Sequence, residues 1–156
     1  TRVMFIEDPD GNRFEIGEFA EWPPPRTEPD SADPARVVVE FFGAMATRDA
    51  AQILPRMTPE PRWESFGRVF EGQRGMRDLI ELAAGAFESG SMRREFHDVI
   101  AQGARVAVRC TSHARTRGGE DYTNAYAFFF ALSGSKIDRV YEFYDSAYAA
   151  THFPSK

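Results

Sequence analysis

Residues 118–146 constrain the fold most, because they form two long, aromatic-rich runs joined by a short turn at Gly134. Each run is long enough for a complete strand, and a lone glycine between two such runs is typical of a hairpin. The second run ends in acidic residues that follow bulky apolar ones. The segment therefore predicts an antiparallel pair with a broad aromatic surface and carboxylates at its border.

Two earlier segments extend this sheet. Short turns at Gly103 and at 118–119 separate runs with strand character, so the sequence predicts an antiparallel meander. The four expected strands cover residues 93–102, 105–116, 122–132 and 136–144. Three prolines, at positions 55, 59 and 61, are expected to break up the segment that they span. A shorter strand is expected after this segment, at 62–68.

Helical patterns precede the sheet. Asp33 and Pro34 suit the start of a helix, since Asp caps free N–H groups and Pro fits the first helical position. The apolar stripe that follows has helical spacing: Val37, Val38, Phe41, Phe42 and Met45. Such a stripe predicts a helix with one buried face. Further helices are expected at 49–57 and 75–89, and a final turn at 145–150.

Three helices followed by an antiparallel meander define an α+β fold. We expect the three helices to pack in a curved, mostly antiparallel sheet, which gives a cone-shaped α+β barrel at residues 33–153. A hairpin extension at residues 1–19, with its turn at Asp8–Gly11, precedes this domain. Residues 20–32 form a proline-rich linker between the two.

Composition narrows the classes of function. The 156 residues carry a formal net charge of −5, which argues against a nucleic-acid partner, because such proteins present a basic face. The sequence has no apolar run of membrane-spanning length and no signal-peptide pattern, so we expect a cytoplasmic protein. Cys110 is the single cysteine and the three histidines are scattered, which predicts no disulfide, no metal site and no cofactor.

The candidate site lies on the last two strands. Five residues there stand among bulky apolar neighbours: Asn124, Tyr126, Glu142, Tyr144 and Asp145. A carboxylate in such surroundings is expected to have a perturbed pKa, so Asp145 is the first candidate for a general base, or else it caps the final turn. Asn124 and Tyr126 either orient a ligand or satisfy buried backbone groups. Glu142 falls on the opposite face from Asp145 and either contacts the ligand or pairs with an arginine across the sheet.

Three further candidates lie on other strands: Trp63, His97 and His113. Trp63 is expected either as a pocket wall or as core, and His97 either as a functional group or as a structurally satisfied histidine. Small and larger polar residues alternate along 105–116, so if the small ones line the cavity, His113 points outward. The arginines at 93–94 are expected in solvent.

Three segments carry a resemblance to a known family: HDVIAQGARVAVR at 97–109, YTNAYAFFFAL at 122–132 and GSKIDRVYEFYDS at 134–146. They resemble the nuclear transport factor 2-like superfamily of α+β barrels, which includes ketosteroid isomerases, and in particular its branch of SnoaL-like polyketide cyclases. Helix starts at Asp33 and Gly75 fit the same pattern, so the resemblance covers residues 32–153. It implies a cavity between the helices and the sheet.

The final strand is similar to that of limonene epoxide hydrolases, which share this fold. Their strand begins with Lys-Ile and ends in acid-aromatic-aromatic-Asp, as residues 136–137 and 142–145 do here. The matching aspartate activates water in that family, so the resemblance implies Asp145 as a general base. SnoaL-like cyclases are similar in using an acid–base aspartate with a pocket histidine, and His113 lies on the corresponding strand.

The first residues resemble a different family. FIEDPDGNRFEI at residues 5–16 is similar to the closing hairpin of vicinal oxygen chelate modules, in which the glutamate that matches Glu15 ligates a metal. The other strands and ligands of such a module are missing from this sequence, and one carboxylate cannot form a metal site. We interpret the hairpin as a remnant of gene fusion or recombination, or as the truncated end of a longer chain. We expect it to pair with a sheet edge or with a neighbouring subunit.

The expected function is cofactor-independent acid–base chemistry on a small or medium apolar, oxygenated molecule. The Arg–Asp pair of the epoxide hydrolases falls near Cys110 and Ser112, so cyclase- or isomerase-type proton transfer is expected before epoxide hydrolysis. A non-catalytic small-molecule binding protein and a dimeric interaction module are the alternatives. Phe129 and Val140 are expected on the outer sheet face, where their apolar side chains predict a homodimer.

Overall fold

The computed structural model describes residues 3–7, 13–17 and 33–153. The first two segments are β1 (Val3–Glu7) and β2 (Arg13–Gly17), which pair antiparallel in a two-stranded sheet. The expected turn at Asp8–Gly11 and the expected linker at 20–32 lie outside the described residues. The division into an extension, a linker and a domain therefore stays a prediction.

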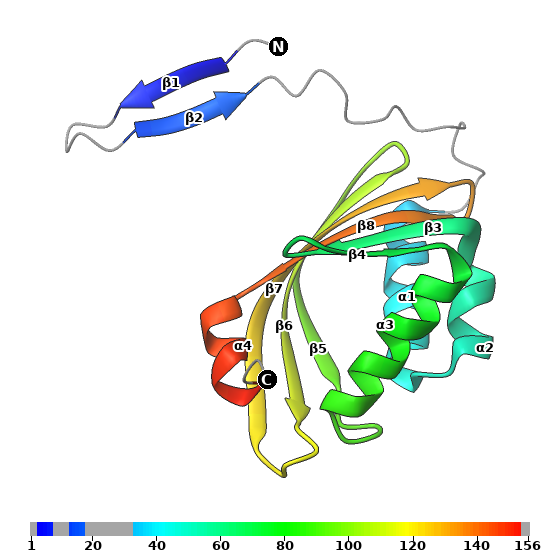
Figure 1. Cartoon of the computed structure of the whole chain (residues 1–156). Helices are drawn as coiled ribbons and strands as arrows, with labels where there is room; N and C mark the ends of the chain where they lie inside the picture. The colour runs from blue at the N-terminus through cyan, green and yellow to red at the C-terminus, as the bar shows by residue number, and fades with distance from the viewer. Residues whose placement is uncertain (1–2, 8–12, 18–32, 154–156) are drawn as a thin grey trace.

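A six-stranded sheet forms the body of residues 33–153 (Figure 1). Its strands are β3 (Met57–Ser65), β4 (Arg68–Glu71), β5 (Arg93–Gln102), β6 (Arg105–Arg115), β7 (Asp121–Ser133) and β8 (Lys136–Tyr144). Their spatial order is β4-β3-β8-β7-β6-β5. Only the β3–β8 pair is parallel among these strands, which confirms a mostly antiparallel sheet.

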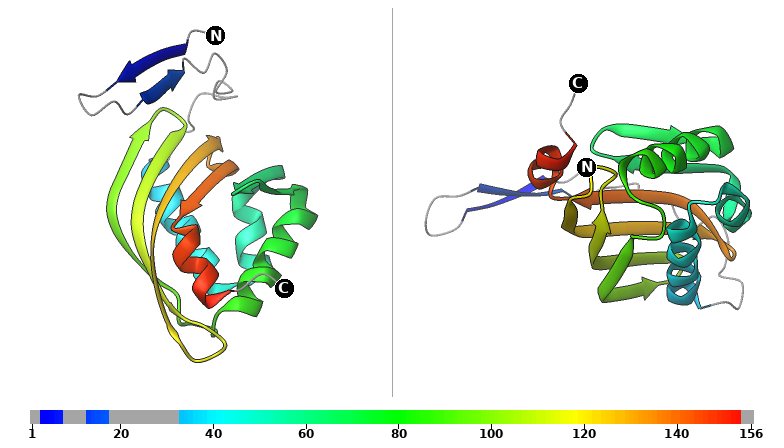
Figure 2. Two further views of the ribbon diagram at one scale, coloured as in Figure 1. Left: turned by 60° about the vertical axis from the view of Figure 1, so that its left-hand side comes forward. Right: turned by 90° about the horizontal axis from the view of Figure 1, so that it is seen from below.

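Four helices complete this part of the fold. The helices α1 (Pro34–Thr47) and α3 (Gly72–Ala86) pack against the concave face of the sheet, which curves around them (Figure 2). The short helix α2 (Ala50–Ile53) continues into the 3-10 helix η1 (Leu54–Arg56), and α4 (Ser146–His152) occupies the place of the expected final turn. The curved sheet and its helices confirm the expected α+β cone.

Helix α1 begins and is buried as its sequence predicts. The Asp33 carboxylate accepts a hydrogen bond of 3.1 Å from a free N–H of the first turn, which Pro34 also occupies. Phe41 and Phe42 are buried, and the centroid of the Phe42 ring lies 5.0 Å from that of Phe128 on β7. Truncating a buried phenylalanine costs about 3–5 kcal/mol, so these rings fix α1 on the sheet.

Strand β3 is longer than the strand expected at 62–68. It contains Pro59 and Pro61, so the expectation that prolines break up this segment was wrong. Its pairing with β8 shifts register between Met57 and Arg62, which places both prolines where the ladder is irregular. Because proline has no N–H to donate, an irregularity of this kind is one of the few places where a strand tolerates it.

Alternate strand residues face the helices and the convex, outer side of the sheet. Cys110 and Ser112 of β6 are buried on the concave side. Val140 is buried in the core, so its expected place on the outer face was wrong. It pairs with Phe130, whereas Phe129 is 45% exposed on the convex face. One residue decides the side, because successive strand residues point to opposite faces.

Candidate functional site

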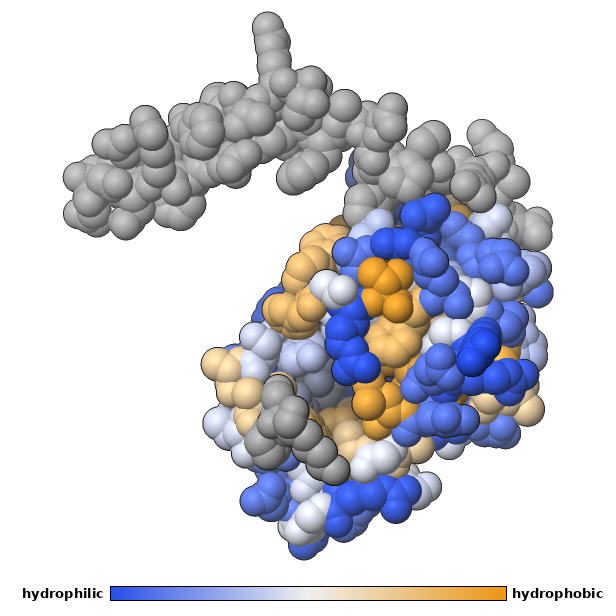
Figure 3. Space-filling model, viewed as in Figure 1, coloured by the Kyte–Doolittle hydropathy of each residue, from blue (hydrophilic) through white to orange (hydrophobic). Residues whose placement is uncertain are grey.

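A cavity of about 290 Å³ lies between the concave face of the sheet, α3 and α4. Its lining combines apolar side chains with a few polar groups: Ser65, Arg68, Phe70, Leu79, Leu82, Ala83, Ala86, Phe87, Tyr122, Tyr126, Glu142, Tyr144, Ala149 and Phe153. Figure 3 shows hydrophobic side chains gathered over β4 and α3. Mostly apolar walls with a few placed polar groups are the usual composition of a small-molecule site.

Glu142 places a carboxyl group in this cavity. It lies opposite Phe128 in the β7–β8 pairing, so its side chain points to the concave side. The indole Nε1 of Trp63 donates a hydrogen bond of 3.0 Å to its Oε2 atom. Burial raises the pKa of Glu142, and hydrogen bonding by Trp63, the charge of Arg94 and hydrogen bonding by Ser65 offset part of the rise. This carboxyl therefore exchanges its proton at a higher pH than an exposed one.

Arg94 lies on the concave side of the sheet and is half-buried, so the expectation that it is solvated was wrong. It pairs across the sheet with Ser112, a buried concave-side residue, and directly opposed residues share a face. Its guanidinium carbon lies 4.8 Å from the ring centroid of Phe42 and 6.0 Å from that of Phe128, within cation–π range. Burial lowers the pKa of Arg94, although the guanidinium stays charged at neutral pH.

A chain of hydrogen bonds ends at the cavity. Nδ2 of Asn124 donates to the Tyr122 hydroxyl at 2.8 Å, and that hydroxyl lies 3.1 Å from the hydroxyl of Tyr126. Burial raises the pKa of Tyr126, and the adjacent Tyr122 adds to the rise. Tyr126 therefore stays protonated at neutral pH and keeps an O–H that can donate.

Trp63 and Tyr144 are two further predicted residues close to Glu142. Trp63 is 2% exposed and belongs to the core, which is one of the two roles that its sequence left open, and its N–H reaches Glu142. Tyr144 lines the cavity with its ring centroid 5.3 Å from that of Tyr126. The structure thus brings four of the predicted residues together from β3, β7 and β8.

Asp145 lies outside this group. It is exposed, and its Oδ1 accepts a hydrogen bond of 2.9 Å from the N–H of Tyr148 at the start of α4. Asn124 holds its backbone, since Nδ2 donates to the Asp145 carbonyl at 2.9 Å and Oδ1 accepts from its N–H at 3.2 Å. The carboxylate is therefore the helix cap that the sequence left open as an alternative.

Both histidine candidates lie on the convex side. Nδ1 of His113 lies 3.2 Å from Oγ1 of Thr123, and its Nε2 lies 3.7 Å from the carboxylate of Glu95. Nε2 of His97 lies 2.8 Å from Oγ1 of Thr111. The sheet therefore separates both imidazoles from the cavity. The small residues of β6 face inward, and His113 consequently points outward, as the sequence predicted for that case.

Sequence reasoning missed Arg94, Tyr122 and the apolar wall that α3 supplies. A signal for Tyr122 was present, because it lies two residues from Asn124 and so shares its face. Arg94 could be placed only with the β5–β6 register, which a bulge between Phe96 and Asp98 alters. The wall from α3 depends on how that helix crosses the sheet, which periodicity does not give.

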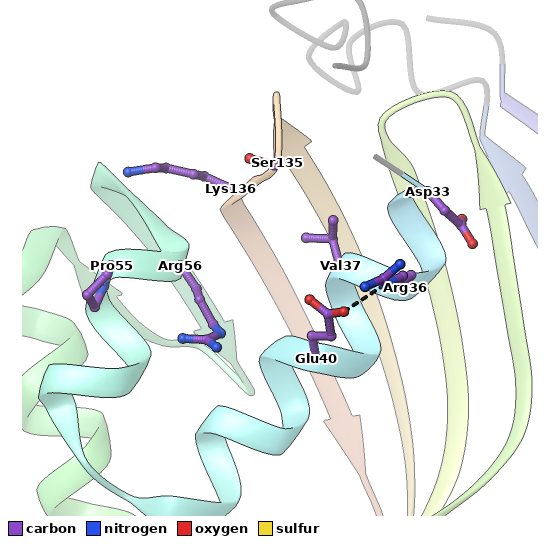
Figure 4. A pocket seen from close by; sticks show the side chains of 8 residues that line it. All are labelled: Asp33, Arg36, Val37, Glu40, Pro55, Arg56, Ser135 and Lys136. Atoms are coloured by element: carbon purple, nitrogen blue, oxygen red, sulfur yellow. Dashed lines mark hydrogen bonds and ion pairs between the residues drawn. The ribbon is translucent and has the colours of Figure 1, made fainter. Parts of the chain in front are cut away.

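A larger hollow, of about 710 Å³, lies between the start of α1, η1 and the β7–β8 turn (Figure 4). The Arg36 and Glu40 side chains in it pair at 2.7 Å and are 77% and 55% exposed. Arg56 donates to the backbone carbonyl of Gln52 at 2.7 Å. Because these charged groups are solvated or already paired, we place the candidate site at the cavity around Glu142 instead.

The described residues contain no cluster of His, Cys, Asp and Glu with the composition of a metal site. Cys110 is buried, and burial raises the pKa of its thiol, which leaves it protonated and poorly nucleophilic. In the same part of the chain, no helix combines the length and apolar character that crossing a membrane requires.

A family model described as the SnoaL-like domain matches residues 38–140. No curated protein matches the chain. A solved structure of an NTF2-like protein of unknown function from Burkholderia pseudomallei K96243 is 17% identical with a TM-score of 0.69, and the match covers 80% of this chain and 100% of that one.

Two further solved structures have related descriptions. A protein from Jannaschia sp. CCS1, described as a SnoaL-like polyketide cyclase, is 15% identical with a TM-score of 0.68, over 79% of this chain and 92% of that one. TerC, crystallised with polyporic acid, is 21% identical with a TM-score of 0.67, over 79% of this chain and 100% of that one. Identities at this level establish a shared fold.

Proposed function

The chain belongs to the family of SnoaL-like domains, and we propose that it is a cofactor-independent enzyme that transfers protons on a small or medium apolar, oxygenated molecule. One observation carries the proposal: the Glu142 carboxyl, with a pKa raised by burial, lines a cavity of about 290 Å³ with mostly apolar walls. Relatives described as polyketide cyclases share the fold, and TerC was crystallised with polyporic acid, an oxygenated ligand. Both support this class of substrate.

The reaction begins with proton removal beside a carbonyl group. The ionised Glu142 carboxylate takes the proton, the C–H bond breaks, and its electron pair moves toward the carbonyl oxygen to give an enolate. The protonated Glu142 then returns the proton to another atom of the same intermediate, which completes an isomerisation or a ring closure. A base with a raised pKa suits both halves of this cycle, because it binds the proton firmly and still releases it.

Tyr126 stabilises the enolate oxygen in this mechanism. A tyrosine hydroxyl donates one hydrogen bond, and Asn124 already donates to Tyr122. Tyr122 can therefore donate onward to Tyr126, which frees the Tyr126 proton for the ligand oxygen. Such a chain strengthens its last member, and fixed donors aimed at a developing charge stabilise it most in a water-poor cavity.

We assign the role of general base to Glu142. The resemblance to epoxide hydrolases had implied Asp145 for this role. Asp145 is exposed, its carboxylate is used as a helix cap, and it is absent from the cavity lining. Epoxide hydrolysis consequently ranks below cyclase- or isomerase-type chemistry in this proposal, because its implied base lies outside the cavity lining.

Proton exchange tests the proposal directly. We expect the wild-type protein to accelerate exchange of the α-protons of 2-tetralone, a bicyclic ketone, in deuterated buffer followed by proton NMR. Glu142→Gln keeps the size of the side chain and should abolish the acceleration. A wild-type protein that binds 2-tetralone without accelerating exchange would make this chain a small-molecule binding protein, the alternative from the same cavity.

We also propose that two copies pair through the convex face of the sheet. Ile100, Phe129 and Phe143 are 64%, 45% and 49% exposed there, around a hollow of about 470 Å³. A second copy presents the same face, so two-fold pairing would cover both apolar surfaces. Light scattering should give a dimer mass for the wild type and a monomer mass for Phe143→Lys; a monomeric wild type contradicts this proposal.

A further inference from the structure

Arg94 is a half-buried cation without an anionic partner among the described residues. No hydrogen bond or ion pair joins its guanidinium to any other residue that the structure describes, and its Nε is buried without an acceptor. The rings of Phe42 and Phe128 hold it through cation–π contacts alone. Such contacts satisfy none of the five N–H donors of a guanidinium, and a buried donor such as the Nε–H is costly to leave without an acceptor.

A stack of two aromatic rings connects Arg94 to the lining of the cavity. It lies over the Phe128 ring, which stacks on the ring of Tyr126 with centroids 5.6 Å apart, and Tyr126 lines the cavity. Glu142 stands opposite Phe128 on the next strand, and its charge acts on Arg94 although the two form no ion pair. A guanidinium and a carboxyl group thus lie on the same concave face of the sheet without contact between them.

A second buried polar group lies beside the Nε–H of Arg94. Ser112 lies directly across from Arg94 on β6 and is 1% exposed, and its hydroxyl has no hydrogen-bond partner apart from a weak interaction with the Cys110 thiol. Buried polar groups are normally satisfied, and exceptions point to an absent ligand or water. The buried Nε–H of Arg94 and the weakly bonded hydroxyl of Ser112 define a place for an anionic oxygen.

We propose that Arg94 binds an anionic oxygen of the substrate, so that the substrate is an apolar molecule carrying an acidic group such as a carboxylic acid or an acidic enol. The inference rests on the proposed function and adds the substrate class to it. Arg94 would hold the group that is charged before the reaction, whereas Tyr126 stabilises the charge that develops during it. Arg94 thereby becomes a specificity-determining residue.

A matched ligand pair tests this inference. 2-Naphthoate and 2-naphthamide have the same shape and differ in charge, so calorimetric titration of both measures recognition of the anionic oxygen. We expect the wild-type protein to bind the acid at least about tenfold more tightly, the size of one charge-assisted hydrogen bond. Arg94→Met should remove that preference, and Arg94→Lys should retain part of it. Arg93→Met, an exposed neighbour on the same strand, is the control for net charge.

Three binding results would overturn the inference. These are equal affinity of the wild type for both ligands, failure of the wild type to bind either, and an acid preference that survives in Arg94→Met. If Arg94→Met changes only the pH dependence of Glu142-catalysed exchange, Arg94 acts on the carboxyl and not on the ligand, and the inference also fails. Exchange of 2-tetralone protons, which involves no acidic group on the ligand, reports on the proposed function separately.

Discussion

The concave and convex faces of the sheet use the same strands and have opposite chemistry. On β8, Glu142 is enclosed between Trp63 and the cavity, whereas the next residue, Phe143, is 49% exposed on the other side. On β6, buried Cys110 and Ser112 alternate with convex residues, among them His113, which forms polar contacts at the surface. His113, a residue type that often serves as a catalytic base, thus lies on the convex face, whereas the candidate base Glu142 lies on the concave face.

Desolvation explains why the concave face is the reactive one. The helices and the cavity walls remove water from Glu142 and Tyr126, and burial is the largest cause of the raised pKa of each. Asp145 directly follows strand β8 and is exposed, and its carboxylate caps α4. Position relative to the helices, more than residue type, separates a candidate base from a structural group.

The largest expected effect compares the two carboxylates. We expect Glu142→Gln to lower the rate of α-proton exchange on a bicyclic ketone by about 10²- to 10⁴-fold, the usual contribution of a general base. Asp145→Asn keeps a good capping side chain and should change the rate by less than about twofold. NMR exchange rates for both variants measure the contrast, and a larger loss in Asp145→Asn would return the base to Asp145.

The second effect compares hydroxyl and imidazole on opposite faces. Tyr126→Phe removes the O–H that we place on the enolate oxygen and should slow exchange by about a hundredfold, typical of one lost oxyanion donor. His113→Ala on the convex face should leave the rate nearly unchanged. Rates at saturating ketone check both variants. Equal losses would mean that the face on which a residue lies does not decide its role.

The third effect concerns the hydrogen bond by which Trp63 stabilises the ionised form of Glu142 on the concave face. Trp63→Phe deletes the indole N–H that bonds the carboxylate, and a hydrogen bond to a charged group is worth about 1.5–3 kcal/mol. The ionised form then becomes less favourable, so the pKa of Glu142 rises further and the rise of activity with pH moves to higher pH. Below the new midpoint the rate should fall about tenfold and recover in alkaline buffer. A uniform loss at every pH would instead indicate misfolding of the pocket.

The smallest effect is on stability. The pKa of Glu142 in the folded state lies above its ordinary value of 4.5, so the favourable contribution of its protonated form is fully present at low pH. It is lost as the pH rises through the folded-state pKa, by at most about 1.4 kcal/mol for each pH unit crossed. Glu142→Gln cannot ionise, and its unfolding free energy relative to the wild type should therefore increase with pH.

Urea denaturation of both proteins in acidic and alkaline buffer measures this difference. Glu81→Gln, an exposed carboxylate on α3, is the matched control and should show little pH-dependent change relative to the wild type. A constant difference between Glu142→Gln and the wild type at all pH values would show that burial does not perturb Glu142.

Much of the fold could be predicted from local pattern. The bounds of β5 and β8 match their predicted ranges, and the Asp33 cap begins α1 as expected, because these features depend on neighbouring residues. The strand through Pro59 and Pro61 could not be predicted, since it requires a partner strand that tolerates an irregular ladder. Arg94 was misplaced for a related reason: its face depends on a bulge in β5.

The candidate site divides in the same way. The sequence by itself determined that aromatic strands would carry Asn124, Tyr126, Glu142 and Tyr144 near one end of a helix-covered sheet, because strand period and apolar content are local properties. The tertiary structure alone decided which carboxylate is enclosed and that a half-buried arginine shares its face of the sheet. Those outcomes depend on register, on bulges and on where α3 and α4 exclude water, and these arise from contacts between residues far apart in the chain.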